Sequence, residues 1–305
     1  MRHVAGLKTR NIIAIILLLV ASITVGAFRY LPIPKPNQEH GPAPPVSPLS
    51  SNVTVYFIDV GQGDSIFIDT PNRDVLIDGG VKSAGSTVVE YLRGLGITRI
   101  DFVVATHPDA DHIGGLITVL TEYNATYMPI IIDSGFAATS TTYQDFIMLA
   151  NERTVEHAVR GQVIILDKYV NLTVLNPQSP FEFDDTNDNS VVLRMQVFNV
   201  TFLFAGDSES ESEASILKAG FNVTSIILKV GHHGSRTATS SAYLNAVKPK
   251  VAIISVGLGN RYGHPHQETL DKLAAMSVTV YRTDLNGTIV ITTDGIHYSV
   301  KTEKS

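Results

Sequence analysis

The densest group of residues able to do chemistry is the run HPDADH, which holds His107, Asp109, Asp111 and His112 within six positions. The chain contains no cysteine, so any metal site must use nitrogen and oxygen ligands. Two imidazoles and two carboxylates form such a set, and it suits Zn, Mn or Fe. A helix capped by an aspartate would explain one carboxylate but neither histidine. We therefore predict a metal site here.

Three later motifs carry similar residue types. FAGD ends in Asp207, and a carboxylate held at a strand end can bridge two cations. KVGHHGS presents the adjacent His232 and His233 after an apolar run, and NRYGHPH holds His264 on a loop fixed by glycine and proline. Each motif is weaker alone than HPDADH, because Gly-Asp turns are common and single histidines often have structural roles.

The elements that must position these motifs read as interleaved strands and helices. Apolar runs lead into HPDADH, FAGD and KVGHHGS, and α/β sheets place their sites at the carboxyl ends of strands. One layered α/β domain beginning near residue 53 is expected. Its strands are expected at 53–59 and 65–70 (a hairpin), 74–78, 100–106, 172–175, 190–197, 201–204, 226–230, 251–256, 278–281 and 288–292. Its helices are expected at 86–95, 208–219, 240–247 and 267–276.

The first thirty residues combine basic side chains with an uncharged apolar run at 12–28. This pattern predicts a hydrophobic helix that is either a signal peptide or an N-terminal membrane anchor, at residues 1–30. The proline-rich residues 31–52 then read as an extended linker to the domain at 53–305. The domain is expected outside the cytoplasmic membrane, anchored or secreted after cleavage.

The charge balance bears on nucleic-acid binding, and the Asn-X-Ser/Thr triplets bear on the location of the domain. Without the first thirty residues the chain has 19 basic against 29 acidic side chains, which argues against strong non-specific binding of nucleic acid. Asn-X-Ser/Thr triplets favour an extracellular glycoprotein, or reflect the preference of Asn and Thr for turns and strand starts. The triplets begin at Asn52, Asn124, Asn171, Asn199, Asn222 and Asn286.

Taken in order, LIDGG around Asp78, HPDADHIGG, AGD and KVGHHGS resemble the successive motifs of metallo-β-lactamase-fold hydrolases. FIDVGQGDSIFI at 57–68, NDNSVVLRM at 187–195, SVGLGNRYGHPH at 255–266 and YRTDLNGTIVI at 281–291 resemble the extracytoplasmic hydrolase domain of the ComEC competence (DNA internalisation) family. The resemblance covers residues 53–297. It implies a four-layer αββα sandwich, with one or two divalent metals, Zn or Mn, at one edge of the sheets.

The resemblance also implies which residues hold the ions. It implies His107 and Asp109 for one ion, Asp111, His112 and His232 for the other, and Asp207 between them. His232 is preferred over His233 because it lies nearer the strand end. Asp109 stands where the wider superfamily has a histidine, which makes the first position poorer in imidazole and favours Mn over Zn.

Four other positions surround this set. Asp78 would brace the ligands, and Asn189 stands where the superfamily has a further histidine. Lys229 would either meet a phosphate oxygen or be a solvated lysine at a strand end. Gln62 and Asp64 would either line the cleft or serve a tight glycine turn.

The implied mechanism is attack of a metal-bound hydroxide on phosphorus or a carbonyl. Asp111 would also orient the hydroxide, and His264 or His233 would protonate the leaving oxygen. The expected function is a phosphodiesterase or nuclease acting on extracellular DNA. The alternatives are hydrolysis of a cell-surface polymer or phosphocholine ester, and a metal-stabilised binding module with little catalysis. The ComEC channel domain has no counterpart here, so the chain is not expected to be a DNA channel, and no protein partner can be inferred.

Overall fold

The computed structural model describes Leu49 and residues 51–305. The predicted N-terminal hydrophobic helix and most of the predicted linker lie outside this range. Among the described residues, no helix is both long enough and apolar enough to cross a membrane.

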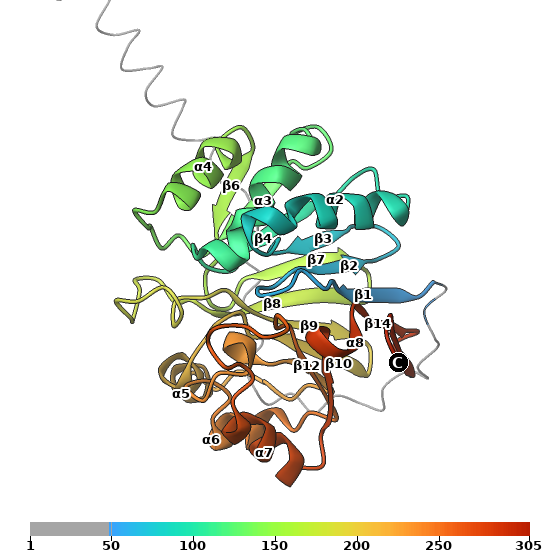
Figure 1. Cartoon of the computed structure of the whole chain (residues 1–305), viewed down its shortest axis with the longest axis vertical. Coiled ribbons are helices and arrows are strands. Elements are labelled where there is room, and N and C mark those ends of the chain that lie inside the picture. Colours follow the sequence, from blue (N-terminus) through green and yellow to red (C-terminus); the bar gives the residue numbers. More distant parts are fainter. Residues whose placement is uncertain (1–48, 50) are drawn as a thin grey trace, which may run out of the picture. The chain divides into compact units, whose positions relative to one another are not determined.

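Two β-sheets form the centre of the described domain (Figure 1). Within residues 51–305, one sheet has eight strands in the order β15-β14-β1-β2-β3-β4-β5-β6, and the other has seven in the order β13-β12-β11-β10-β9-β8-β7. The first sheet contains β1 (Val53–Phe57), β2 (Ile66–Asp69), β3 (Val75–Ile77), β4 (Phe102–Ala105), β5 (Ile130–Asp133), β6 (Thr154–His157), β14 (Ile289–Thr293) and β15 (Tyr298–Thr302). The second contains β7 (Val163–Asp167), β8 (Val170–Asn176), β9 (Val192–Val197), β10 (Val200–Phe204), β11 (Ile227–Lys229), β12 (Val251–Ile254) and β13 (Thr279–Arg282).

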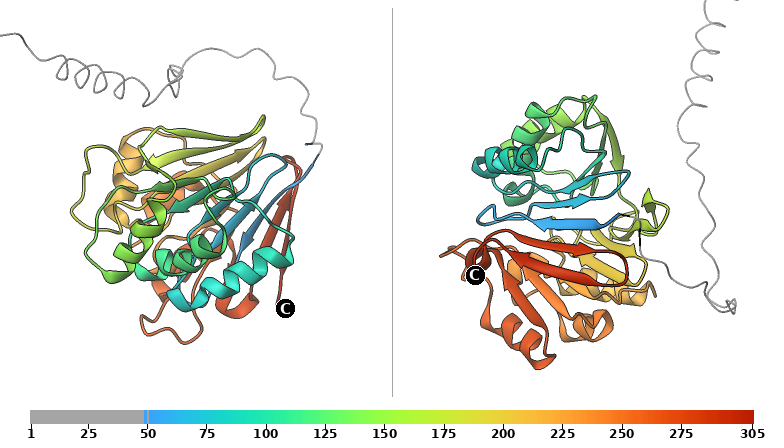
Figure 2. Two further views of the ribbon diagram at one scale, coloured as in Figure 1. Left: turned by 90° about the horizontal axis from the view of Figure 1, so that it is seen from above. Right: turned by 90° about the vertical axis from the view of Figure 1, so that its right-hand side faces the viewer.

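Helices cover the outer face of each sheet, which gives four layers in the order αββα (Figures 1 and 2). The eight-stranded sheet carries α2 (Gly85–Gly94), α3 (Ala110–Glu122) and α4 (Thr141–Ala150). The seven-stranded sheet carries α5 (Ser210–Lys218), α6 (Ser241–Val247) and α7 (Gln267–Ala275). The short elements are η1 (Lys82–Ala84), η2 (Gly231–Gly234) and α8 (Thr283–Asn286). This arrangement is the sandwich that the sequence predicts.

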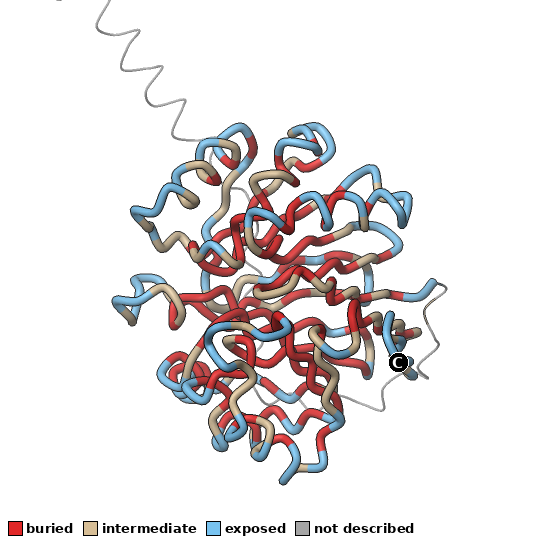
Figure 3. The backbone as a smooth tube through the Cα atoms, in the orientation of Figure 1, coloured by how far each residue is buried: buried red, intermediate tan, exposed pale blue. Residues whose placement is uncertain are grey.

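The apolar side chains form three layers that match this order. Alternate residues of β1 (Val53, Val55 and Phe57) are buried between the sheets, whereas Tyr56 faces the helices outside. The period of two in a strand produces this alternation. Figure 3 shows the resulting buried strands at the centre and exposed loops around them. Two further apolar clusters join each sheet to its own helices.

The topology brings the predicted motifs to one edge of the sandwich. Strand β3 pairs in parallel with β4, and β10, β11 and β12 are parallel neighbours. Their carboxyl ends therefore lie at matching edges, and each end leads into a motif: Asp78 follows β3, His107 follows β4, and Asp207 follows β10. The predicted hairpin at 53–70 is confirmed as the antiparallel pair of β1 and β2.

Candidate metal centre

His112 lies in the first turn of α3, and Asp78 fixes its orientation. Asp78 Oδ2 lies 2.8 Å from His112 Nδ1, and Asp78 also accepts hydrogen bonds from the backbone N–H and the hydroxyl of Thr106 at 2.8 and 2.7 Å. A carboxylate on one imidazole nitrogen sets the tautomer and leaves the other nitrogen free to bind a cation. His112 Nε2 accordingly lies 3.3 Å from Asp207 Oδ1.

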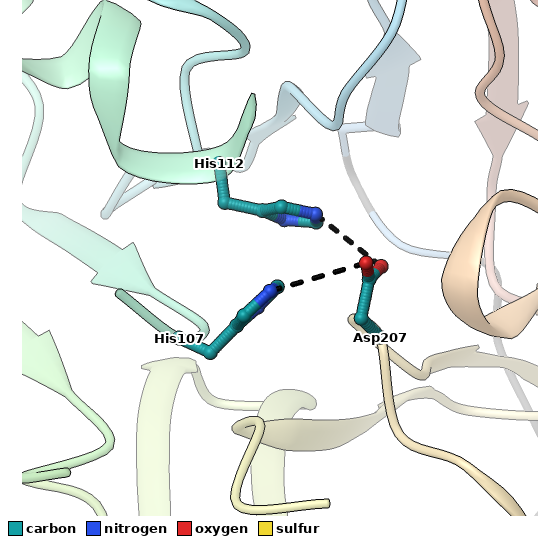
Figure 4. A group of neighbouring side chains, drawn as sticks. All are labelled: His107, His112 and Asp207. Carbon is teal, nitrogen blue, oxygen red and sulfur yellow. Dashed lines mark ion pairs between the residues drawn. The ribbon is translucent and has the colours of Figure 1, made fainter. Parts of the chain in front are cut away.

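His107 approaches the same carboxylate from the end of β4. Its Nε2 lies 3.9 Å from Asp207 Oδ2 (Figure 4). The same nitrogen lies 3.9 Å from Asp109 Oδ2. The side chain of His107 is fully buried, and within the described residues its Nε2 has no hydrogen-bond partner; Asp207 Oδ1 has none either. Buried polar atoms without partners are rare in folded proteins. Their convergence on one point fits a cation between them.

His233, rather than His232, belongs to the central cluster. His233 Nε2 lies 3.4 Å from Asp207 Oδ2, 3.5 Å from Asp111 Oδ2 and 3.3 Å from His112 Nε2. Both histidines have positive φ, at 47° for His232 and 52° for His233, so the chain turns sharply after β11. The donor sets contain His233 and not His232, whereas His232 Nε2 lies 3.8 Å from Asp207 Oδ2. The sequence-based choice of His232 as a ligand stays a prediction.

The donor atoms of these residues lie close enough to share ions. Two sets have all their donor atoms within 4.8 Å of one another: His107, His112 and Asp207 form one, and Asp111, His112 and His233 form the other. Asp64, Asp78 and His112 form a third set, but its carboxylates are engaged by Lys229 and Thr106. Nitrogen and oxygen donors of this kind fit one or two divalent cations such as Zn or Mn.

The electrostatics keep the central carboxylate, Asp207, ionised. Burial opposes the charge of Asp207, but His233 and His112 outweigh it and hold the pKa of Asp207 well below its usual value. Burial likewise opposes the charged forms of His112 and His233, but Asp207 and its neighbours raise the pKa of both imidazoles. Burial lowers the pKa of His107 to about 4, and His112 adds to that effect. A cation that enters would take the place of the protons on these imidazoles.

Lys229 does not face a substrate. Its side chain is completely buried, and Nζ lies 2.7 Å from Asp64 Oδ2 and donates to the carbonyl oxygen of Val230 at 2.9 Å. Both predicted roles, the phosphate contact and the solvated lysine, disagree with this position because the ammonium group is held in the interior. Asp64 is equally buried and therefore does not line a cleft; its Oδ1 lies 3.5 Å from His233 Nδ1, which donates to the Ser255 carbonyl oxygen at 2.9 Å.

Gln62 and Asn189 hold loops beside the cluster. Gln62 Oε1 accepts a hydrogen bond from the Gly257 N–H at 3.3 Å. Asn189 donates from Nδ2 to the carbonyl oxygens of Phe183 and Asp185, both at 2.7 Å, so its amide nitrogen is committed to a loop. Gly63, next to Gln62, has φ +127°, and a Cβ added at this position would lie 2.1 Å from the Asp111 carbonyl oxygen, so only glycine permits this close approach.

The sequence-based prediction omitted Glu209. Its Oε1 lies 2.7 Å from His232 Nδ1, and His232 Nε2 lies 3.8 Å from Asp207 Oδ2. The position of Glu209 two residues after Asp207 was the available signal. His264 lies beside this pair, with its ring centroid 5.4 Å from that of His232 and 6.4 Å from that of His233.

Comparison with known proteins gives a family model and several relatives. The model described as "Metallo-beta-lactamase superfamily" matches residues 58–257. ComE operon protein 3 of Bacillus subtilis (strain 168) is 35% identical over an alignment of 261 positions that covers 79% of this chain and 33% of that protein. Competence protein ComA of Neisseria gonorrhoeae is 33% identical over 239 residues, which are 78% of this chain and 31% of that protein. The chain spans about a third of the length of these curated relatives.

Solved structures share the fold. CmlA, a diiron β-hydroxylase from Streptomyces venezuelae, matches with a TM-score of 0.51 and 12% sequence identity, over 80% of this chain and 54% of that chain. At this identity the likeness concerns the fold alone.

Proposed function

Because the chain belongs to the metallo-β-lactamase superfamily, we propose that it is a metal-dependent phosphodiesterase whose substrate is nucleic acid. The observation that carries this proposal is the convergence of His107, His112, His233 and Asp207 on one buried point at the edge of the sandwich. The competence proteins among its relatives support nucleic acid as the substrate. The acidic composition of the domain argues against strong non-specific binding along a nucleic-acid backbone, so recognition must come from the site itself.

The proposal divides the ligands between two positions. His107 and Asp109 would hold one cation and Asp111, His112 and His233 the other, and Asp207, which lies within 3.9 Å of His107, His112 and His233, would be available to both. One or two divalent ions there would provide a nucleophile from water near neutral pH and neutralise charge that builds up on the phosphate oxygens. The donor set around His107 also contains His112, so both positions offer imidazole nitrogen, and the set fits Zn or Mn.

The exposure of the ligand side chains indicates from which side a substrate can reach the site. The side chains of His107, His112 and Asp207 are at most 5% exposed, whereas Asp109 is 46% and Asp111 26% exposed. The substrate therefore approaches from the side of Asp109 and Asp111. The carboxylate of Asp111 is placed to accept a proton from water on that side.

A proton donor for the leaving oxygen would lie on the opposite rim. His233 is buried among the ligands and is poorly placed for this step. His264 remains a candidate, and the structure adds His232, which is 24% exposed and held through Nδ1 by Glu209. Glu209 leaves Nε2 of His232 directed to the cluster.

The location of the domain is also a proposal. We infer from residues 1–30 that the domain is held outside the cytoplasmic membrane, or secreted after cleavage. Four of the six glycosylation triplets begin at exposed residues, namely Asn52, Asn124, Asn199 and Asn222, which is compatible with this location.

The test is hydrolysis of single- and double-stranded DNA, and of a bis-aryl phosphodiester, by the full chain in detergent with Mn²⁺, Mg²⁺ or Zn²⁺. We expect metal-dependent cleavage that the His112→Ala variant loses and the His297→Ala variant retains, because His297 is an exposed residue beyond β14. Equal turnover by the parent and His112→Ala would contradict the proposal. Bound metal without hydrolysis of any of these substrates would favour a metal-stabilised binding module.

A further inference from the structure

The loop between β12 and α7 carries a row of aromatic rings that starts at the candidate metal centre and ends in solvent. The ring of His264 lies 5.4 Å from that of His232, centroid to centroid, and the ring of Tyr262 is stacked on His264 at 5.7 Å with an angle of 24° between the planes. Tyr262 is 48% exposed, and Leu258 in the same loop is 81% exposed. An exposed aromatic ring beside a candidate metal centre offers an apolar surface to a ligand that binds there.

Asn260 holds this loop in one shape. Its Nδ2 donates to the carbonyl oxygens of Gly257 and His264 at 3.0 and 2.6 Å, and its Oδ1 accepts the N–H groups of Tyr262 and His264 at 3.2 and 3.0 Å. Both ends of the amide are thus used to brace the loop. The exposed ring of Tyr262 is therefore presented in a fixed position, which reduces the entropy lost when a ligand binds.

Arg261 places a cation on the same surface. Its guanidinium carbon lies 4.9 Å from the centroid of the Tyr262 ring, and Nη2 donates to the Tyr262 hydroxyl at 2.8 Å. A guanidinium group can bind a phosphate and can also stack on a planar base. The Arg261 guanidinium is a positive charge on an otherwise acidic domain, and it disfavours the binding of a cationic ligand at the Tyr262 ring.

We propose that Tyr262 and Arg261 form a platform on which an unpaired nucleobase of the substrate stacks while its phosphodiester lies at the metal centre. The proposal rests on the proposed function. The bases of a duplex are already stacked on one another, so a single exposed ring selects a base that is free to leave the stack. The platform thus makes single strands or strand ends the preferred substrate.

The absence of tryptophan from the chain makes the contact measurable, because Tyr262→Trp introduces a single tryptophan. We expect a phosphorothioate thymidine oligonucleotide, at a fixed concentration of Mn²⁺, to quench this fluorescence strongly, and an abasic strand of equal length to quench it weakly. Tyr127→Trp is the matched control. Tyr127 is 49% exposed and its carbonyl oxygen accepts from Ile100 ahead of β4, at the opposite end of that strand from His107.

Kinetics provide the second readout. Tyr262→Ala is expected to raise KM for single-stranded DNA roughly 5- to 100-fold, in line with the loss of one base–aromatic stack, with a smaller change in kcat. Tyr127→Ala is expected to leave both constants unchanged.

The outcomes separate this proposal from the proposed function. Equal quenching by both strands, or an unchanged KM in an active Tyr262→Ala variant, would overturn the platform. Stronger quenching by phosphocholine than by the oligonucleotide would also overturn it, in favour of a quaternary ammonium ligand. Base-dependent quenching in a chain that hydrolyses no DNA would uphold the platform and refute the proposed nuclease activity.

Discussion

Glu209 and His232 form a hydrogen-bonded pair at the rim of the candidate metal centre, with 2.7 Å between Oε1 and Nδ1. The carboxylate holds the imidazole so that its other nitrogen lies 3.8 Å from Asp207. A carboxylate that orients an imidazole in this way supports metal or proton chemistry without touching the substrate itself.

The first prediction removes this support. Glu209→Ala should lower kcat by about 10- to 100-fold, a usual effect of losing such a partner, while the bound metal stays within twofold of the parent. Glu211→Ala is the control because Glu211 is exposed on the first turn of α5. An unchanged kcat in Glu209→Ala would assign the pair a purely structural role.

The second prediction concerns Asp78, whose side chain is fully buried against His112 and Thr106. Asp78→Asn replaces the charged carboxylate by a neutral amide that has only one acceptor oxygen. The hydrogen bond to His112 Nδ1 is therefore weakened, and His112 is less well oriented. We expect metal affinity to fall by about 10- to 100-fold. Competition with a fluorescent chelator measures this change, and an affinity equal to that of the parent would show that His112 needs no brace.

The third prediction follows from the buried pair of Lys229 and Asp64. Lys229→Met leaves the carboxylate of Asp64 buried without its cation, and removal of one partner of such a pair costs about 3–5 kcal/mol of unfolding free energy. The double variant with Asp64→Asn should recover part of that loss. Urea denaturation measures both values. A stability loss below about 1 kcal/mol in Lys229→Met, together with a raised KM, would instead indicate that Lys229 contacts the substrate.

The fourth prediction is a dependence of stability on pH. Burial raises the pKa of Asp74 to about 7. The hydrogen bond from the Thr70 N–H lowers this pKa, whereas the negative charges of Asp69 and Asp101 raise it further. The folded state thus holds this proton to a higher pH than the unfolded state, so the contribution of Asp74 to stability declines as pH rises from about 4 to about 7.

Asp74→Asn removes that titration and keeps an oxygen for the Thr70 N–H. The unfolding free energy of the variant, relative to the parent, should therefore increase between about pH 4 and about pH 7. Parallel stability curves for the two proteins over this range would contradict the prediction.

Strands and ligand motifs could be predicted because both have local signals. The apolar runs before His107, Asp207 and His232 predicted strands, and β4, β10 and β11 lie there. Strands β5, β6, β7 and β15 were not predicted. Strands β6 and β15 contain no buried residue and give no clear apolar pattern, whereas β5 and β7 do contain buried residues and were overlooked. Helices α3 and α4 were not assigned either, and along α4 only Phe146 and Ala150 are buried.

The choice between neighbouring histidines could not be made from sequence. His232 and His233 have the same residue type, and in the folded chain both approach Asp207 Oδ2, with Nε2 at 3.8 and 3.4 Å. Only the fold shows that His233 also lies beside Asp111 and His112. The burial of Lys229 was hidden for a similar reason. Its counter-charge, Asp64, lies 165 positions earlier and meets it only when the two sheets pack together.

The central claim is that His107, His112, His233 and Asp207 hold a divalent cation, and metal analysis tests it most directly. The full chain is dialysed against Mn²⁺ or Zn²⁺ and then against metal-free buffer. It should retain one or two ions per chain, as counted by inductively coupled plasma mass spectrometry. His112 belongs to both donor sets, so the His112→Ala variant should retain few ions or none. Its circular dichroism spectrum should stay that of the parent. A folded parent chain that binds no divalent ion, or a His112→Ala variant that binds as many as the parent, would contradict the account.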